Sequence, residues 1–291
     1  MIKKLDKLER IEVDASDKAD IRFRFPAAPR SGKVSIEAKQ LSKSFGDLEV
    51  FKNVDFILPR QQKVALVGKN GAGKTTLTRI FMEMEAAKGS LTIGHNVDIG
   101  YYAQNQAEEL DGDLTVFETL DEVAVGEIRK RLRSILGSFL FSGEDADKKV
   151  RVLSGGEKAR LALCKLLLHP YNLLILDEPT NHLDIRAKEV LKGALKAYDG
   201  TLIVVSHDRD FLSELTEMVY EVTPNGLKQY IGDIKQFLHE KHATSIRAYE
   251  SKKGETMTKT DAATSNKKPE TTSNKESYSA RKERERTERK L

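Results

Sequence analysis

Residues 68–76 combine three glycines, two lysines and two threonines in the spacing Gly-x4-Gly-Lys-Thr-Thr. Glycines let successive backbone N–H groups turn toward phosphate oxygens, and a helix that follows adds the free donors of its first turn. The lysine of such a loop reaches the β- and γ-phosphates, and the next threonine places its hydroxyl where Mg²⁺ binds. We therefore expect a loop that binds a nucleoside triphosphate, rather than an ordinary glycine turn, through Gly68, Asn70, Gly71, Gly73, Lys74, Thr75 and Thr76.

Two carboxylates follow a second apolar run. Asp177 and Glu178 come directly after residues 172–176, which are apolar enough for a buried strand. At the carboxyl end of a parallel strand, Asp177 can hold Mg²⁺ directly or through water, and Glu178 can polarise an attacking water. The alternative is that the two acids merely begin a loop that is exposed to solvent. The position downstream of a phosphate loop favours the metal and base roles.

A histidine follows a third apolar run. His207 comes two residues after residues 201–205. Alone, such a histidine is more often structural than catalytic. Because the carboxyl ends of parallel strands meet at the edge where open α/β sheets bind ligands, we expect His207 to face the γ-phosphate.

Residues 154–157, Ser-Gly-Gly-Glu, open a helix that Pro170 ends. Ser154 and Glu157 have the spacing of a capping box, so an ordinary helix cap explains them. Gly155 and Gly156 are not needed for a cap. They leave the helix N-terminus approachable by an anionic phosphate.

The elements around these sites divide the chain. Residues 34–103 are rich in short β-like runs and contain Phe45, a loop aromatic that could stack on a base. Residues 114–141 have helical periodicity and form an insertion, and Asn225-Gly226 between two β-like runs signals a hairpin. A helix is expected to begin near Asp233.

Both ends of the chain differ from its centre. Residues 241–291 hold 14 Lys+Arg against 8 Asp+Glu, a charge of +6, whereas residues 1–240 hold 35 against 37, a charge of −2. We expect this tail to be largely disordered, with the possible start of a coiled coil near its end. Residues 1–20 have the spacing of an amphipathic helix, and residues 21–25 alternate like an exposed strand.

Composition limits the compartment and excludes several classes of protein. The single cysteine, Cys164, permits no intrachain disulfide and lies in an apolar helix, where we expect a buried thiol. No apolar run approaches the ~18 residues of a membrane helix, and the first twenty residues are too charged for a signal peptide. A cytoplasmic protein with no membrane span of its own is expected.

The motifs in this order resemble the nucleotide-binding cassette of the ABC superfamily. They are the phosphate loop, Leu-Ser-Gly-Gly-Glu at 153–157, Leu-Asp-Glu-Pro at 176–179 and Ser-His-Asp at 206–208. Gln104 matches the glutamine loop of that superfamily and Asp184 its D-loop. The resemblance covers residues 34–240. It implies an α/β P-loop NTPase fold with a β-rich N-terminal subdomain, a parallel-sheet core and a helical insertion at about residues 110–150.

Within the superfamily the chain looks most like the C-terminal cassette of ABC-F proteins, which lack membrane domains and act on ribosomes. Glu157, where transporters usually carry glutamine, favours this subgroup, as do residues 181–184 and 206–212. Residues 1–33 look like the end of the interdomain linker that contacts tRNA in that family. The tail, residues 241–291, is similar to an extension that some members carry.

The resemblance implies an ATPase with Mg²⁺ as cofactor. Phe45 would stack on adenine, Glu178 would be the base and His207 the γ-phosphate sensor. The implied ligands of Mg²⁺ are Thr75, Gln104 and Asp177.

The resemblance also implies composite sites, in which ATP on one phosphate loop is closed by Ser154, Gly155, Gly156 and Glu157 of a partner cassette. ABC-F chains carry two cassettes, whereas this chain has one phosphate loop. We therefore expect either a fragment of a two-cassette protein or a head-to-tail pair of copies. The ribosome and tRNA are the expected further partners. Two alternatives stay open: the energising subunit of an ABC transporter, and an ABC ATPase that binds nucleic acid through its basic tail.

Overall fold

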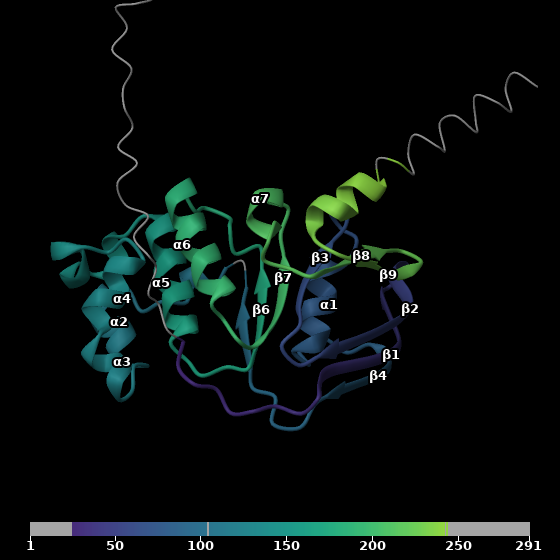
Figure 1. Ribbon diagram of the computed structural model, residues 1–291, viewed down its shortest axis with the longest axis horizontal. Coiled ribbons are helices and arrows are strands. Elements are labelled where there is room, and N and C mark those ends of the chain that lie inside the picture. Colours follow the sequence, from purple (N-terminus) through teal and green to yellow (C-terminus); the bar gives the residue numbers. More distant parts are fainter. Residues whose placement is uncertain (1–24, 104, 242, 244–291) are drawn as a thin grey trace, which may run out of the picture. The chain divides into compact units, whose positions relative to one another are not determined.

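The computed structural model describes residues 25–103, 105–241 and 243 of the 291-residue chain (Figure 1). Its contacts form one unit of Met1–His239 and a second of Glu240–Leu291, and every named helix and strand belongs to the first. The strands are β1 (Val34–Phe45), β2 (Leu48–Pro59), β3 (Lys63–Val67), β4 (Lys88–Ile93), β5 (Ile99–Tyr102), β6 (Leu173–Asp177), β7 (Thr201–Val205), β8 (Met218–Thr223) and β9 (Gly226–Ile231). The α-helices are α1 (Lys74–Phe81), α2 (Val116–Asp121), α3 (Glu127–Lys130), α4 (Leu132–Ser138), α5 (Gly155–Leu167), α6 (Ile185–Lys196) and α7 (Arg209–Leu212).

A six-stranded sheet in the order β5-β6-β7-β3-β8-β9 forms the centre of the first unit. Its first five strands are parallel, and β9 returns antiparallel to β8 through the turn at Pro224 and Asn225, just before Gly226. The apolar runs that precede the three chemical motifs are β3, β6 and β7, and every residue of β6 and β7 is buried. The predicted parallel core and the predicted hairpin are confirmed.

A second, three-stranded antiparallel sheet in the order β2-β1-β4 holds most of the N-terminal part. β1 and β2 are paired along almost their whole length, with Phe45 opposite Leu48 beside the connecting turn. The prediction that Phe45 lies in a loop is therefore wrong: it is the last residue of β1. β1 continues past Ala38 through residues 39–44, and its pairing with β2 goes on to Phe45 across several register shifts.

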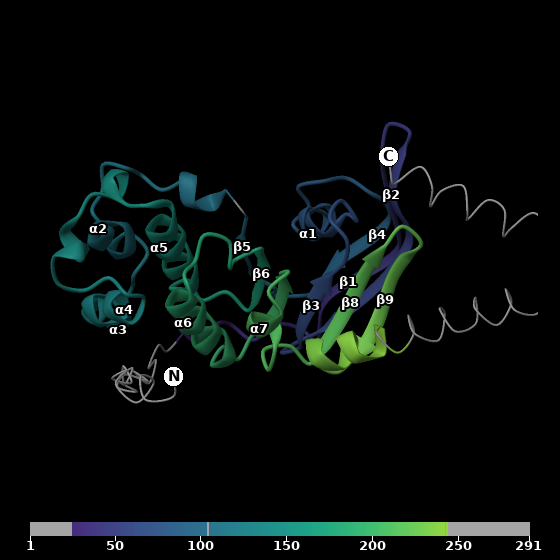
Figure 2. The same cartoon turned by 90° about the horizontal axis from the view of Figure 1, so that it is seen from above.

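The six-stranded sheet separates two hydrophobic cores. Side chains alternate along each strand, so Leu174 and Leu176 of β6 enter the core that contains α5 and α6, while Ile175 enters the core that contains α1 and the three-stranded sheet. Figure 2 shows α1 and α5 on opposite sides of β6. The two helices that begin with glycine motifs are thus attached to opposite faces of one sheet.

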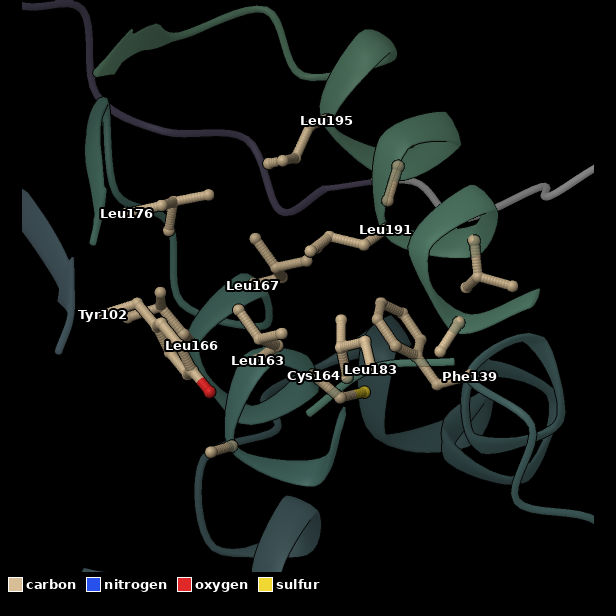
Figure 3. Close-up of a cluster of buried hydrophobic side chains, with 14 of the residues drawn as sticks. Tyr102, Phe139, Leu163, Cys164, Leu166, Leu167, Leu176, Leu183, Leu191 and Leu195 are labelled. Carbon is tan, nitrogen blue, oxygen red and sulfur yellow. The ribbon is translucent and has the colours of Figure 1, made fainter. Parts of the chain in front are cut away.

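The core around α5 is shown in Figure 3, where leucines of α5 and α6 pack against Tyr102, Phe139 and Leu176. Cys164 lies among them, fully buried, and burial raises the pKa of its thiol. The expected buried, unreactive cysteine is confirmed.

The helical insertion is present but divided. Instead of one continuous stretch, α2, α3 and α4 follow one another, and Gly126 separates the first two with a φ of 57°. A left-handed residue cannot continue a right-handed helix, so the chain turns there. Of these helices, α2 buries Val116 and Leu120, and α4 buries Leu132 and Leu136, in the core that contains α5. This arrangement confirms the predicted fold class of a parallel core with a β-rich N-terminal part and inserted helices.

Several predictions fall outside the described residues: the helix expected in residues 1–20, all but Phe25 of the strand expected in residues 21–25, Gln104, and almost all of the basic tail, residues 241–291. A helix does begin at Ile234, as expected near Asp233. Within the part of the chain that the structure describes, no helix is both long and apolar enough to cross a membrane.

Candidate functional site

Three motif-bearing strands end at one edge of the six-stranded sheet. β7 lies between β3 and β6, and its last residue, Val205, is paired with Leu66 near the end of β3 and with Asp177 at the end of β6. The parallel direction of the three strands brings the phosphate loop, the two carboxylates and His207 to the same edge. The structure thus brings together the residues that the sequence analysis expected to meet there.

The phosphate loop, residues 68–76, owes its shape to its glycines. Gly71 and Gly73 have φ values of 77° and 94°, which side chains disfavour. A Cβ on Gly73 would also lie 2.5 Å from Val50 Cγ1, so this position has no room for a side chain. Gly73 is also the N-cap of α1 and makes no side-chain cap bond. The first turn of α1 therefore has no capping side chain in front of its N–H donors.

Lys74 folds back over this loop. Its Nζ donates to the carbonyl oxygens of Gly68 at 3.1 Å and Lys69 at 3.2 Å, and the residue is only 8% exposed. Burial lowers the pKa of Lys74, while the nearby carboxylates Glu178 and Asp177 act in the opposite direction. The ammonium group is held between the loop carbonyls and the two acids, where a phosphate group could replace part of its contacts.

Asp177 is the buried acid of the site. It is 3% exposed, and its Oδ1 has no hydrogen-bond partner. Burial raises the pKa of its carboxyl, against the opposing effects of the Thr75 hydroxyl, Lys74 and Arg79. A buried oxygen without a partner, beside a hydroxyl, is a fit for Mg²⁺, which prefers hard oxygen ligands.

Thr75 and Asp177 both line a cleft of about 650 Å³. Among the described residues, no group of three or more His, Cys, Asp and Glu side chains could hold a metal ion. Two protein oxygens are nevertheless sufficient for Mg²⁺ when substrate phosphates and water supply the remaining ligands. Ala103 and Asn105, the neighbours of Gln104, line the same cleft, whereas Gln104 itself lies outside the described residues.

Glu178 and His207 form a pair beside this cleft. Glu178 has a φ of 52°, and its backbone N–H donates to Val205 O at 2.8 Å, which ties the bend after β6 to the end of β7. Its Oε1 is buried without a hydrogen bond, 3.5 Å from His207 Nε2. Burial raises the pKa of Glu178, and His207 opposes that shift. The side chain of His207 is 55% exposed.

The Ser-Gly-Gly-Glu segment, residues 154–157, begins α5. Ser154 caps the helix through Glu157 N–H, and Glu157 accepts bonds from the Ser154 N–H at 2.8 Å and hydroxyl at 2.6 Å. These bonds to Ser154 lower the pKa of Glu157. The predicted capping box is confirmed.

The two glycines of this segment differ. A Cβ on Gly156 would lie 2.6 Å from His182 O, whereas a Cβ on Gly155 would meet nothing within 4 Å. Gly156 therefore packs against the loop before α6, and Gly155 faces open space. Asp184, the expected D-loop residue, caps α6 by accepting a hydrogen bond from the Ala187 N–H. Its Oδ2 lies 3.5 Å from Nη1 of Arg160 on α5.

Not all predicted residues meet. Among the described residues, no hydrogen bond or ion pair joins 154–157 to 68–76, and the helices that these two segments begin lie on opposite faces of the sheet. Phe45 is 49% exposed on the β1–β2 hairpin, with Lys43 Nζ 4.7 Å from its ring centre. Its ring is accessible, and base stacking stays a prediction.

Several residues that line the cleft were not predicted from sequence. Arg79, Tyr101 and His182 line it together with Thr75 and Asp177. Arg79 follows Thr75 by four residues on α1, so the helical spacing could have placed it on the same face. His182 has a φ of 65° in the loop after β6, a conformation that no periodicity signals.

Comparison with known proteins identifies this arrangement. A family model described as ABC transporter matches residues 51–181. The chain is 42% identical over 252 residues to "ABC transporter F family member 2" of Arabidopsis thaliana, covering 85% of this chain and 37% of that protein. It is 39% identical over 241 residues to "Probable ATP-binding protein YbiT" of Escherichia coli O157:H7, covering 82% and 46%. The chain thus spans less than half the length of these curated relatives.

Solved structures show the same fold at lower identity. A bacterial Atm1-family ABC exporter with ATP bound has a TM-score of 0.62 at 21% identity, covering 74% of this chain and 41% of that chain. An ATP-binding cassette in a dimeric post-hydrolysis state, bound to ADP and Pi, has a TM-score of 0.56 at 22% identity, covering 67% and 98%. These similarities concern the fold.

Proposed function

This chain belongs to the ABC-F family of ATP-binding cassette proteins, and from this premise we propose that it binds ATP with Mg²⁺ and hydrolyses it to ADP and phosphate. One observation carries the proposal: the phosphate loop, the buried Asp177 and the Glu178–His207 pair converge at one sheet edge. Phosphate-binding donors, a metal ligand and a proton acceptor are the parts that phosphoryl transfer requires.

Different groups of the chain would have different roles in this reaction. Backbone N–H groups of residues 68–76 and the Lys74 ammonium would bind and orient the phosphates. Thr75 and Asp177 would hold Mg²⁺, which when bound neutralises the charge that develops on the phosphate oxygens. Glu178 would accept the proton of the attacking water. Its raised pKa favours that role, because a base whose pKa lies nearer to neutral holds the proton more readily.

His207 would complete this arrangement. With its Nε2 3.5 Å from Glu178 Oε1, the imidazole can contact the same water or the γ-phosphate. The site would also need a second cassette. Since α1 and α5 lie on opposite faces of the sheet, residues 154–157 would close ATP bound to a partner, in a head-to-tail pair or within a longer chain.

The test is Glu178→Gln, which removes the base and keeps the side-chain shape. We expect ATP affinity to be retained and turnover to fall roughly 10²-fold or more, the usual contribution of a general base. Glu189→Gln, at an exposed position of α6, is the matched control. An unchanged rate of phosphate release in the Glu178 variant, with wild-type turnover detectable, would remove Glu178 from this role.

The wider role proposed is action on the ribosome in the cytoplasm. Its support is the similarity to ABC-F proteins and the charge of +6 on residues 241–291, which favours contact with RNA phosphates. A Glu178→Gln protein held in the ATP-bound state should co-sediment with ribosomes more strongly than wild type with ADP. Loss of a salt-dependent affinity on deletion of residues 241–291 would assign the contact to the tail. Co-purification with a membrane protein instead would favour a transporter subunit.

A further inference from the structure

His207 lies between Ser206 and Asp208, and both of these neighbours are held by side-chain hydrogen bonds. On one side, Ser206 Oγ and Thr180 Oγ1 are 3.2 Å apart and buried. On the other, the Asp208 N–H donates to the same Ser206 Oγ at 3.0 Å. The short peptide that carries the imidazole is therefore held at both ends by side-chain bonds rather than by strand pairing.

Each carboxylate oxygen of Asp208 accepts a further hydrogen bond. Oδ1 accepts the Phe211 N–H at 3.0 Å and so caps α7, while Oδ2 accepts Lys188 Nζ of α6 at 2.7 Å. Lys188 and Asp208 are partly buried, with side-chain exposures of 33% and 23%. A charged bond of this length that is partly shielded from water holds its partners better than an exposed pair.

Lys188 is the first of three lysines spaced four residues apart on α6. Lys192 donates to the Asp210 carbonyl oxygen, and Lys196 Nζ lies 2.7 Å from Glu214 Oε2. Residues at this spacing lie along one helix face, so the three contacts form a row from α6 to residues 208–214. Lys188 alone in this row contacts the neighbour of His207, and Lys196 offers the same chemistry at the far end.

We propose that Lys188 is a positioning residue for His207: through Asp208 it fixes the peptide from which the imidazole reaches toward Glu178. This inference rests on the proposed ATPase function and deepens it. The imidazole is more than half exposed, so its own packing does not select one orientation, and the anchored backbone does. Loss of the Lys188 contact should leave nucleotide binding intact and reduce the fraction of complexes in which His207 is correctly placed.

The kinetic test compares Lys188→Met with Lys196→Met, since both lose a charge and keep the length of the side chain. We expect kcat for ATP to fall about fivefold in the Lys188 variant, the effect of a partly exposed ion pair on barrier height, with KM unchanged. Lys196→Met should match wild type. Lys188→Arg, which keeps the charge, should restore most of the rate. Equal rates for the two methionine variants would overturn the proposal.

A double-mutant cycle tests the route through Asp208. Asp208→Asn keeps an oxygen to cap α7 but loses the charge that attracts Lys188. The double variant Lys188→Met/Asp208→Asn should then be no slower than either single variant, because all three lack the same contact. Independent, multiplying losses would show that Lys188 acts by another route.

Nuclear magnetic resonance of the His207 imidazole provides a readout without turnover. We expect its ring resonances to shift or broaden in Lys188→Met and to stay unchanged in Lys196→Met. Unchanged resonances in the Lys188 variant would contradict the positioning role even if wild-type turnover were absent. Absence of wild-type hydrolysis together with the expected shift would instead contradict the proposed ATPase function alone.

Discussion

Two helices of this protein begin with glycine motifs, and their N-termini differ. At α1 the capping residue is Gly73, which contributes no side chain, and a lysine is the next residue. At α5 the capping residue is Ser154, and the carboxylate of Glu157 accepts the Ser154 N–H and hydroxyl. The first terminus is left open to an anion from outside, whereas the second already carries an anion of its own.

The pKa values of the carboxylates near the two helix N-termini are shifted in opposite directions. Beside α1, burial raises the pKa of Asp177 and of Glu178. At α5, hydrogen bonds from Ser154 lower the pKa of Glu157. The two acids at α1 therefore carry an unfavourable negative charge that a bound cation can relieve, while Glu157 at the start of α5 is satisfied by hydrogen bonds within the protein. This contrast fits a loop that binds nucleotide first and a segment that joins later.

The largest expected effect comes from removing the charge at the α1 terminus. Lys74→Met loses an ammonium that would pair with phosphate, and truncating one partner of a buried charge pair costs about 2–5 kcal/mol. We expect ATP affinity, measured by calorimetry, to fall on the order of a hundredfold or more. Lys158→Met, at the corresponding first turn of α5, should change ATP affinity by less than about twofold.

A similar loss of affinity in both lysine variants would erase the distinction between the two termini. Thermal unfolding of each variant should accompany the calorimetry, because a Lys74 variant that no longer folds says nothing about phosphate binding.

The two glycines of α5 provide the next test. In Gly156→Ala the new Cβ would lie 2.6 Å from His182 O, so the loop before α6 must move, at a cost of about 1–3 kcal/mol in unfolding free energy. Gly155→Ala meets open space and replaces glycine in a helix, so it should be neutral or stabilising by up to about 1 kcal/mol. Urea denaturation of both variants measures the difference. Equal stabilities would mean that Gly156 does not fix the loop.

This asymmetry shows where inference from sequence ends. Gly155 and Gly156 belong to the same motif, and both were expected to keep the N-terminus of α5 approachable. Only a tertiary contact distinguishes Gly156 from Gly155. The strands and the phosphate loop were predictable because composition and spacing are local. The alignment of Asp177 with Val205 followed from the rule that parallel strands share an edge.

Other features depended on distant contacts or on backbone conformation. Phe45 was expected in a loop, yet strand pairing with β2 extends to it across several register shifts. Residues 114–141 were expected to be helical, and helical periodicity does not reveal that they form three short helices or that Gly126, with a positive φ, precedes α3. His182 reaches the cleft from a loop that lacks any periodic signal. Backbone dihedrals and long-range packing set these positions.

The buried acid at the α1 site gives a smaller effect that depends on pH. Because the folded-state pKa of Asp177 is raised, its ionised form destabilises the ligand-free protein at neutral pH, and this cost disappears as pH falls below the unfolded-state pKa of about 3.9. Asp177→Asn should therefore raise the free energy of unfolding at pH 7 by about 1 kcal/mol. The gain should shrink toward pH 4 in urea titrations with EDTA and no nucleotide. A loss of stability at pH 7 would show that the carboxylate is satisfied by contacts within the protein.

The smallest effect, and the opposite sign, is expected at α5. The lowered pKa of Glu157 means that its ionised form stabilises the fold above the unfolded-state pKa of about 4.3, and this contribution is lost as pH falls through the folded-state pKa. Glu157→Gln keeps the reach to Ser154 but removes the charge, so it should cost about 0.5 kcal/mol at pH 7, the scale of a charge at a helix N-terminus, and less at pH 4. The same urea titrations measure it. If Glu157→Gln and Asp177→Asn shift stability in the same direction at pH 7, the contrast between an open and a self-capped terminus is wrong. Opposite shifts would support the contrast, with a buried acid that destabilises the fold beside α1 and a capping acid that stabilises it at α5.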